Sequence, residues 1–334
     1  MSDSAGTDHQ QQDNTEEEAM RGARKSVLMR FTFVRHGETL ANKNRCIQGH
    51  ADIPLCENGE QQATRAGERL RDVRFTRVYA SDLCRAAHTC QLIVAQNTRH
   101  PPPIIIDKRL RERNFGSVEG MSFDEVLKMA EAIGSSWPHY NPPGAETVGD
   151  LQARLVAFFK EVCQSIYDKT NYKMSKSKAS KDSQKAAQEL TPNGTQNQEN
   201  EEKEAEVEEE NLRNEAKERE EEERRRQETE ARRAVEGEGE TNTTKDEDDN
   251  GKDEEGDDEG EHVLVVSHGA ALRQLYTHLH RTLACPLPPN AGPDDPVTRL
   301  SPNTAVSQYT VRYSPKSYIM QCLCIHDNRH NEGM

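Results

Sequence analysis

The chain has 334 residues, a formal net charge of −15 and only 32% hydrophobic residues. An ordinary globular domain is roughly 45–50% apolar, so this average combines two kinds of sequence. Residues 199–261 hold 30 acidic and 11 basic residues, a net of −19, which leaves the rest of the chain mildly basic at +4. This distribution excludes a uniformly acidic protein and favours anionic ligands for the remainder.

Targeting and redox signals are absent from the sequence pattern. No apolar run reaches the roughly 18–20 residues that cross a bilayer, so no membrane span is expected. The first 29 residues carry six carboxylates and no apolar segment, unlike a signal or transit peptide, which predicts a cytoplasmic protein. The 8 cysteines lack the paired spacing of a zinc site, so reduced thiols are expected.

The chain opens with a predicted disordered tail at 1–29, which has no aromatic residue and cannot bury enough surface to offset its ordering entropy. Short β-prone runs then alternate with amphipathic segments. The predicted elements are a strand at 30–34, a helix at 58–70, a strand at 78–80, a helix at 83–95 and a strand at 104–106. This β-α-β-α-β order is typical of a mostly parallel sheet with helices on both faces.

The second half is interrupted by a long polar segment. Helices are predicted at 123–133 and 148–167, but residues 173–261 contain no aromatic side chain and are dominated by charged and small polar residues. We therefore expect a disordered charged insertion, within which 206–233 has the Glu and Arg spacing of an isolated helix. A buried strand at 262–267, a helix at 270–280, strands at 306–313 and 318–325 and a tail at 328–334 follow.

Residues 30–172 and 262–327 are thus predicted to form a single α/β domain, a three-layer sandwich of helices on both faces of a mostly parallel sheet. Their combined length is sufficient for one core.

Two histidine motifs carry the strongest chemical signal. Arg35-His36-Gly37 directly follows one predicted strand, and Ser267-His268-Gly269 directly follows another. Because parallel strands end at the same edge of a sheet, both histidines are expected in one cleft. Arg35 and Arg85 add permanently charged planar forks suited to phosphate oxygens. The pattern predicts a cationic, phosphate-binding cleft.

Glu112, in the loop after the third strand, is the predicted proton donor. Its neighbours Arg111 and Arg113 would hold the carboxylate ionised if they pointed at it, so this role requires them to point elsewhere. A metal site built from His36, Glu38 and His268 is an alternative. Adjacent arginines would repel a cation, so no metal and no other cofactor is expected.

Three motifs resemble the histidine phosphatase superfamily, which has the phosphoglycerate mutase-like fold. They are Arg35 to Thr39, Ser81 to Ala86 and Ser267 to Gly269. Looser matches at 110–120, 142–147 and 301–304 resemble its fructose-2,6-bisphosphatase branch. The resemblance runs from about Met29 to His330 without the insertion, and Met29-Arg30-Phe31 resembles a family start, so translation from Met29 is a further expectation. Ala145 departs from the glycine typical of relatives.

The resemblance implies a metal-independent phosphatase that works through a phosphohistidine intermediate. It gives His36 the role of nucleophile, Glu112 that of general acid and then base, and Arg35, Arg85 and His268 that of charge stabilisers. It also implies substrate contacts from Asn42, Gln48, Gly49 and Gly269. The implied substrate is a small phosphorylated metabolite, fructose 2,6-bisphosphate or 2,3-bisphosphoglycerate, whose hydrolysis would restrain glycolysis. The family also admits nuclear or mitochondrial locations.

Other functions remain open from the sequence. A phosphoglycerate mutase or a phosphoprotein phosphatase would use the same phosphate pocket. A non-enzymatic interaction protein is less favoured because the set of charged site residues is intact, although the acidic insertion offers a surface for a basic protein partner. Nucleic-acid binding lacks support, since the basic residues are few and are not interleaved with aromatic ones.

Overall fold

A computed structural model of the chain describes residues 26–137, 140–189, 260–289, 291 and 295–333, with the side chains of its longest helix described as far as Lys176. One compact unit comprises Met1–Lys176 and Asp257–Met334, and a second comprises Ser177–Gly256. The predicted isolated helix at 206–233, most of the tail at 1–29 and the acidic surface expected to bind a basic partner lie outside the described residues.

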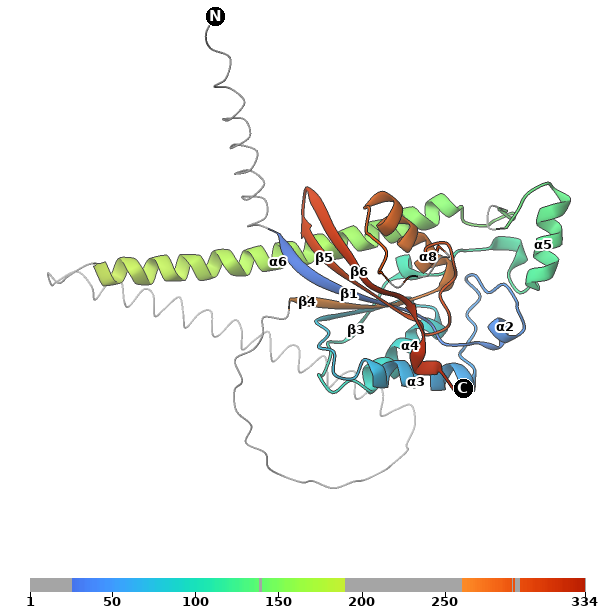
Figure 1. The fold of residues 1–334 in the computed structure, drawn as a ribbon, viewed down its shortest axis with the longest axis horizontal. Helices are drawn as coiled ribbons and strands as arrows, with labels where there is room; N and C mark the ends of the chain where they lie inside the picture. The colour runs from blue at the N-terminus through green and yellow to red at the C-terminus, as the bar shows by residue number, and fades with distance from the viewer. Residues whose placement is uncertain (1–25, 138–139, 190–259, 290, 292–294, 334) are drawn as a thin grey trace, which may run out of the picture. The chain divides into compact units, whose positions relative to one another are not determined.

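Strands and helices alternate through the first unit (Figure 1). The strands are β1 (Val27–Arg35), β2 (Arg77–Ala80), β3 (Ile104–Ile106), β4 (Glu261–Ser267), β5 (Val306–Ser314) and β6 (Ser317–Asp327). The α-helices are α2 (Leu40–Lys43), α3 (Glu57–Arg69), α4 (Cys84–Ala95), α5 (Phe123–Ala132), α6 (Val148–Glu189) and α8 (Gly269–Thr277). The chain also forms three short 3₁₀-helices among the described residues, η1 (Lys108–Leu110), η2 (Gly116–Val118) and η4 (Arg329–Asn331). A short π-helix, η3 (His278–Thr282), follows α8.

The strands form one sheet in the order β3-β2-β4-β1-β5-β6. β4 pairs in parallel with both β1 and β2, and β2 pairs in parallel with β3. β5 and β6 complete the sheet as antiparallel strands. Because β4 lies between β1 and β2, the carboxyl ends of these three strands meet at one edge.

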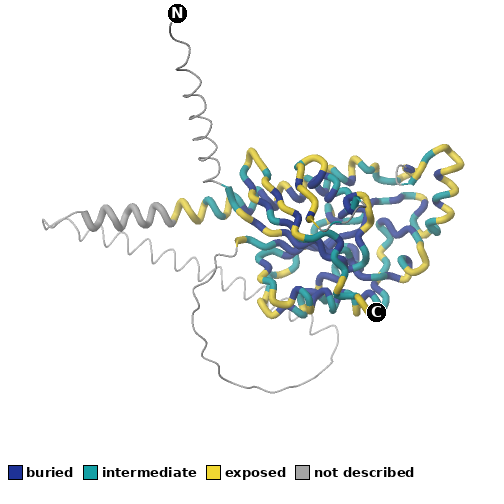
Figure 2. Tube along the Cα trace, in the orientation of Figure 1, coloured by how far each residue is buried: buried dark blue, intermediate teal, exposed yellow. Residues whose placement is uncertain are grey.

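Alternate residues of the strands supply two separate cores, which makes a three-layer sandwich as predicted. On one face, Phe31 and Phe33 of β1 are fully buried with side chains of α6 and α8. On the other, Val34 and Leu264 pack with side chains of α3 and α4. A third apolar cluster involves α5 and the 115–118 segment. Figure 2 shows the buried chain concentrated along the sheet.

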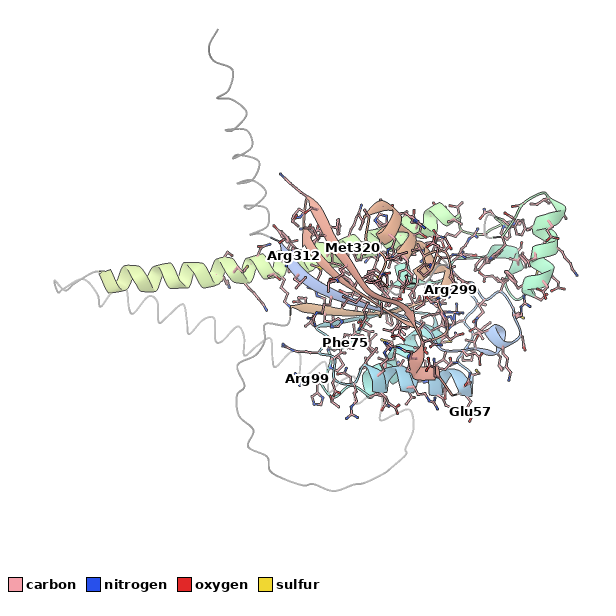
Figure 3. The ribbon with its side chains drawn as sticks, viewed as in Figure 1. Glu57, Phe75, Arg99, Arg299, Arg312 and Met320 are labelled. Atoms are coloured by element: carbon pink, nitrogen blue, oxygen red, sulfur yellow. The ribbon has the colours of Figure 1, made fainter. Side chains whose placement is uncertain are left out.

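The alternation persists to the outer strands. Met320 of β6 is buried, whereas Arg312 of β5 is exposed to solvent (Figure 3). Phe75 is buried in the second core, just before β2. All eight cysteines are free thiols. No helix among the described residues is long and apolar enough to cross a membrane.

Three predicted boundaries are wrong. β1 begins at Val27, so the tail predicted to extend to residue 29 includes three strand residues, Val27 to Met29, and Val27 pairs with Tyr313 of β5. The helix predicted to end near 167 runs to Glu189, past the expected start of the insertion at 173. From 173 to 189 the sequence has no proline or glycine, so nothing breaks the helix.

The tail predicted at 328–334 is also wrong in its described part. Residues Arg329–Asn331 form η4, and the Asn331 side-chain amide donates to Thr304 Oγ1 at 2.8 Å. The ion pair between Arg69 and Asp327, at 2.6 Å, fixes the end of β6 to α3. Side-chain hydrogen bonds of this kind leave no hydrophobic periodicity in the sequence, so the segment reads as a tail.

Candidate active site

The site lies where β1, β4 and β2 end. Arg35 is paired with Ser267 in the parallel register, and the next residues along the two strands are His36 and His268. The His36 amide donates to the Ser267 carbonyl at 2.9 Å, and the two imidazole ring centroids are 5.2 Å apart. The predicted meeting of the two histidines is therefore observed.

The His36 ring is oriented by its neighbour Gly37. Its Nδ1 lies 2.7 Å from the Gly37 carbonyl oxygen, which can only accept, so Nδ1 carries the proton and Nε2 keeps its lone pair. Burial lowers the pKa of His36 well below its usual value, and the positive charges of Arg35 and Arg85 lower it further. The ring is therefore neutral at physiological pH, with the lone pair on Nε2.

The His268 ring is oriented from the end of β2. Its Nε2 lies 2.9 Å from Ser81 Oγ, and the same oxygen is 3.3 Å from the Leu83 amide, whose hydrogen it accepts. The Ser81 hydroxyl hydrogen is then available for His268 Nε2, and when it is donated there the ring proton lies on Nδ1. That Nδ1 is buried without a partner among the described residues. Burial, then the charge of Arg85, lowers the pKa of His268 well below its usual value.

Two arginines, Arg35 and Arg85, act electrostatically on both histidines. Arg35 donates to the Ser301 carbonyl at 2.7 Å, and Arg85 donates to the carbonyls of Ala51 and Gly49, both at 2.8 Å. Burial lowers the pKa of Arg35 to about 10, an effect that the charge of Glu112 opposes. Within the described chain, Nε of each arginine lacks a hydrogen-bond partner. Buried positive charges and donors of this kind suit an anionic ligand.

The Glu112 carboxylate lies at the N-terminus of α8. It accepts hydrogen bonds from the amides of Ala270 and Ala271, both at 3.0 Å, and from the amide of Arg113 at 2.8 Å. The neighbouring arginines point elsewhere, which is the condition that the role of proton donor set: Arg111 forms a two-pronged pair with Asp82, and the Arg113 guanidinium donates to the carbonyls of residues 140 and 146.

Glu38, the carboxylate of the alternative metal site, is engaged by another residue. Glu38 Oε2 accepts from the side-chain amide of Asn58 at 2.9 Å, so Glu38 braces the start of α3. Across the residues that the structure describes, no group of three His, Cys, Asp or Glu side chains could hold a metal ion.

Comparison with known proteins identifies the family. A sequence profile of the histidine phosphatase superfamily (branch 1) matches residues 31–172. The fructose-2,6-bisphosphatase TIGAR of Xenopus tropicalis is 32% identical over 308 residues, covering 90% of this chain and 94% of that protein. That of Bos taurus is 30% identical over 316 residues, covering 91% and 97%. The chain belongs to the histidine phosphatase superfamily. The predicted family, the resemblance to proteins named fructose-2,6-bisphosphatase TIGAR and the enzyme class, a phosphatase, are thereby confirmed.

Solved structures confirm the fold of the superfamily. Phosphoglycerate mutase from Bacillus anthracis str. Sterne aligns with a TM-score of 0.55 at 19% identity, over 92% of this chain and 96% of that one. A mycobacterial glucosyl-3-phosphoglycerate phosphatase aligns with a TM-score of 0.52 at 18% identity, over 90% and 99%. At these identities the likeness concerns the fold alone.

Four further residues were expected at the ligand of this histidine phosphatase. Gln48 is buried with its Oε1 unpartnered in the described chain, and exchanging the amide oxygen and nitrogen would turn it into a donor. Gly49 has φ +53°, and its carbonyl accepts a hydrogen bond from Arg85. Gly269 lies against Arg35, because a Cβ added to this glycine would be 3.4 Å from Arg35 Nε. Asn42 differs, because its Oδ1 accepts from the Thr39 amide and caps α2.

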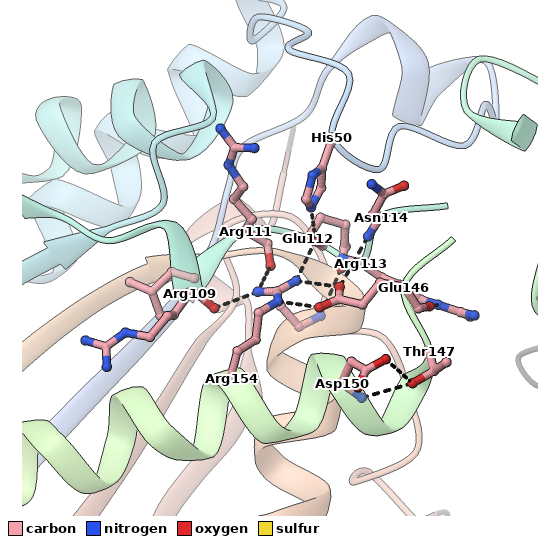
Figure 4. Close-up of polar contacts among 12 residues, drawn as sticks. His50, Arg109, Arg111, Glu112, Arg113, Asn114, Glu146, Thr147, Asp150 and Arg154 are labelled. Atoms are coloured by element: carbon pink, nitrogen blue, oxygen red, sulfur yellow. Dashed lines mark hydrogen bonds and ion pairs between the residues drawn. The ribbon is translucent and has the colours of Figure 1, made fainter. Parts of the chain in front are cut away.

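Sequence reasoning missed several supporting residues of the phosphatase site. Ser81 orients His268, Asn303 donates to the His36 carbonyl at 3.0 Å, and the Thr304 amide donates to the Arg35 carbonyl at 3.0 Å. All three fall inside motifs that resemble the family, at 81–86 and 301–304, and that position was the available signal. Arg154 holds the main chain of the Glu112 loop (Figure 4), but it lies in no recognisable motif, so no signal in the sequence pointed to it.

Proposed function

We propose that the chain hydrolyses a small bisphosphorylated metabolite, with fructose 2,6-bisphosphate as the first candidate and 2,3-bisphosphoglycerate as the second, and so restrains glycolysis. The observation that carries the proposal is His36 Nε2, an unprotonated ring nitrogen in the same site as Nε of Arg35, Nε of Arg85 and Nδ1 of His268, which are buried without a hydrogen-bond partner among the described residues. The TIGAR relatives, named fructose-2,6-bisphosphatases, support the choice of substrate.

In the first step, His36 Nε2 attacks phosphorus, the N–P bond forms and the bond from phosphorus to the leaving oxygen breaks. Glu112, in its protonated form, gives its proton to that oxygen. The hydrogen bond from His36 Nδ1 to the Gly37 carbonyl stabilises the positive ring that results. Arg35, Arg85 and the Nδ1–H of His268 stabilise charge on the three other phosphoryl oxygens.

In the second step, the Glu112 carboxylate takes a proton from water while the water oxygen attacks phosphorus. The N–P bond breaks, inorganic phosphate leaves and His36 returns to its neutral form. Glu112 is again protonated, which closes the cycle. The same proposal includes substrate contacts from Gln48, Gly49, Gly269 and Asn42. Because Asn42 Oδ1 already accepts from the Thr39 amide, Asn42 would contact the substrate only by donating from its side-chain nitrogen.

Phosphate release from the purified chain tests this function. The panel comprises fructose 2,6-bisphosphate, 2,3-bisphosphoglycerate, 3-phosphoglycerate and a phosphopeptide, with chelator present. We expect release from a bisphosphate, and loss of both release and acid-labile phosphoenzyme in His36→Ala, a cost on the order of 5 kcal/mol in transition-state stabilisation. Labelling that persists in His36→Ala would refute the nucleophile, and transfer of phosphate to a second metabolite instead of water would identify a mutase.

A further inference from the structure

The segment that carries Glu112 follows the short edge strand β3. Its main chain is held in place by side chains of other elements. Four successive main-chain carbonyls, at residues 109–112, accept side-chain hydrogen bonds from elsewhere in the fold. Ser267 Oγ donates to the Leu110 carbonyl at 2.7 Å, and His50 Nε2 donates to the Glu112 carbonyl at 2.9 Å. The remaining bonds all come from one guanidinium, that of Arg154.

Arg154 makes five hydrogen bonds, drawn in Figure 4. Its Nη1 donates to the carbonyls of Arg109 at 2.6 Å and Arg111 at 2.8 Å, and its Nη2 donates to the carbonyl of Glu112 at 2.8 Å. Its Nε and Nη2 also donate to the two Glu146 carboxylate oxygens, at 2.6 and 2.8 Å. A planar fork with five N–H donors can satisfy such a set, and a lysine ammonium cannot.

Both ends of this connection are fixed. Arg154 lies on α6, whose neighbouring residues Leu151 and Leu155 are buried in the core against the sheet. Glu146 lies in the loop before α6, and the amide of residue 146 donates to the Asn114 carbonyl at 2.9 Å. Arg154 therefore ties the Glu112 segment to a rigid helix and to the loop that precedes it.

We propose that Arg154 is a positioning residue, which fixes the main chain of Glu112 so that its carboxyl meets the leaving oxygen of the substrate. This inference rests on the proposed function, in which Glu112 is the proton donor. A displacement of about 1 Å at a reacting group can cost about 100-fold in rate. The loss should concern proton donation, since the hydrogen bonds of Arg154 go to the Glu112 segment and to Glu146. A lysine at this position keeps the positive charge that acts on His268.

Leaving-group dependence provides the test, because an alkoxide needs a proton and a dinitrophenolate does not. We would measure kcat/KM, which reports the step up to the first phosphoryl transfer, for the best bisphosphate of the panel and for 2,4-dinitrophenyl phosphate. For Arg154→Lys we expect a fall of about 10- to 100-fold with the alkyl ester and less than about 3-fold with the aryl ester. Glu112→Gln provides the reference for the same split.

Arg109→Lys is the matched control. Arg109 lies on the same segment, but its side chain pairs with the carboxylates of Asp107 and Glu161 and lies over the Phe158 ring, so both esters should react at wild-type rates. Glu146→Gln is a milder second variant that keeps every carbonyl contact of Arg154, and we expect a smaller fall with the same split.

Equal losses for both esters in Arg154→Lys and Glu146→Gln, or lowered thermal stability with both rates unchanged, would overturn the positioning role alone. A wild-type chain inactive toward every ester would overturn the phosphatase function and this role with it.

Discussion

Different neighbours orient the two site histidines. In His36 a main-chain carbonyl one residue away holds the proton on Nδ1, which leaves the lone pair on Nε2. In His268 the Ser81 hydroxyl, distant in sequence, lies at Nε2, and a hydroxyl that donates there leaves the ring proton on Nδ1. Strand-end motifs are enough to predict that the histidines meet. The tautomers could not be predicted, because one depends on the local turn of the backbone after β1 and the other on a hydroxyl from another strand.

Ser81→Ala should therefore impair His268 as a donor. Without the hydroxyl, the His268 proton can move to Nε2, which would turn the lone pair of Nδ1 toward the anion. We expect kcat/KM to fall by about 10-fold, in line with about 1–2 kcal/mol for one buried hydrogen bond, and the ¹⁵N shifts of His268 to report a change of tautomer. Unchanged ring shifts would contradict this account of Ser81.

The loop that follows His36 and the start of α3 lie very close together. A Cβ on Gly37 would lie 2.3 Å from the Gly59 carbonyl oxygen, and one on Gly59 would lie 2.0 Å from the Glu38 carbonyl oxygen. The loop after β1 and the start of α3 thus touch main chain to main chain. Element types and order could be predicted from hydrophobic periodicity, whereas this contact, the antiparallel direction of β5 and β6 and the full length of α6 depend on tertiary packing or on the absence of a breaker.

Gly37→Ala should destabilise the fold, because the methyl group collides with rigid backbone. We expect the free energy of unfolding to fall by about 1–3 kcal/mol, measured by urea denaturation. Gly149→Ala is the control, since its Cβ would be 3.7 Å from its nearest neighbour, Thr147 Oγ1, and alanine should stabilise the first turn of α6. Equal stability of the two variants would show that the close approach relaxes freely.

At the scale of the whole molecule, burial keeps several histidines neutral. Besides His36 and His268, the pKa of His262 and that of His330 are lowered to about 4, in each case chiefly by burial. His262 lies at the start of β4 and His330 in η4, at separate places around the sheet. Folding therefore excludes protons that the unfolded chain would accept.

Stability should consequently fall as the pH falls below about 6.5. Between that value and the lowered pKa of each histidine the unfolded state binds more protons, so the free energy of unfolding decreases with acidification, by at most about 1.4 kcal/mol per pH unit for each group. Urea denaturation at pH 7.5, 6 and 5 would measure the slope. His262→Gln should lose less stability over this range than the wild type, and an identical slope would contradict the contribution of His262.

The position of β4 in the sheet determines when the molecule can fold during synthesis and how it can be split into fragments. This strand lies between β1 and β2, although its partner residues Met29 and Glu261 are more than two hundred positions apart. During synthesis, β1 and β2 leave the ribosome long before the strand that joins them, so neither the sheet nor the histidine pair can assemble until residue 268 has emerged. A fragment ending at Lys176 would carry His36, Arg35, Arg85 and Glu112 without activity, and the fragment from Asp257 onward would have to restore it by inserting β4 as a separate chain.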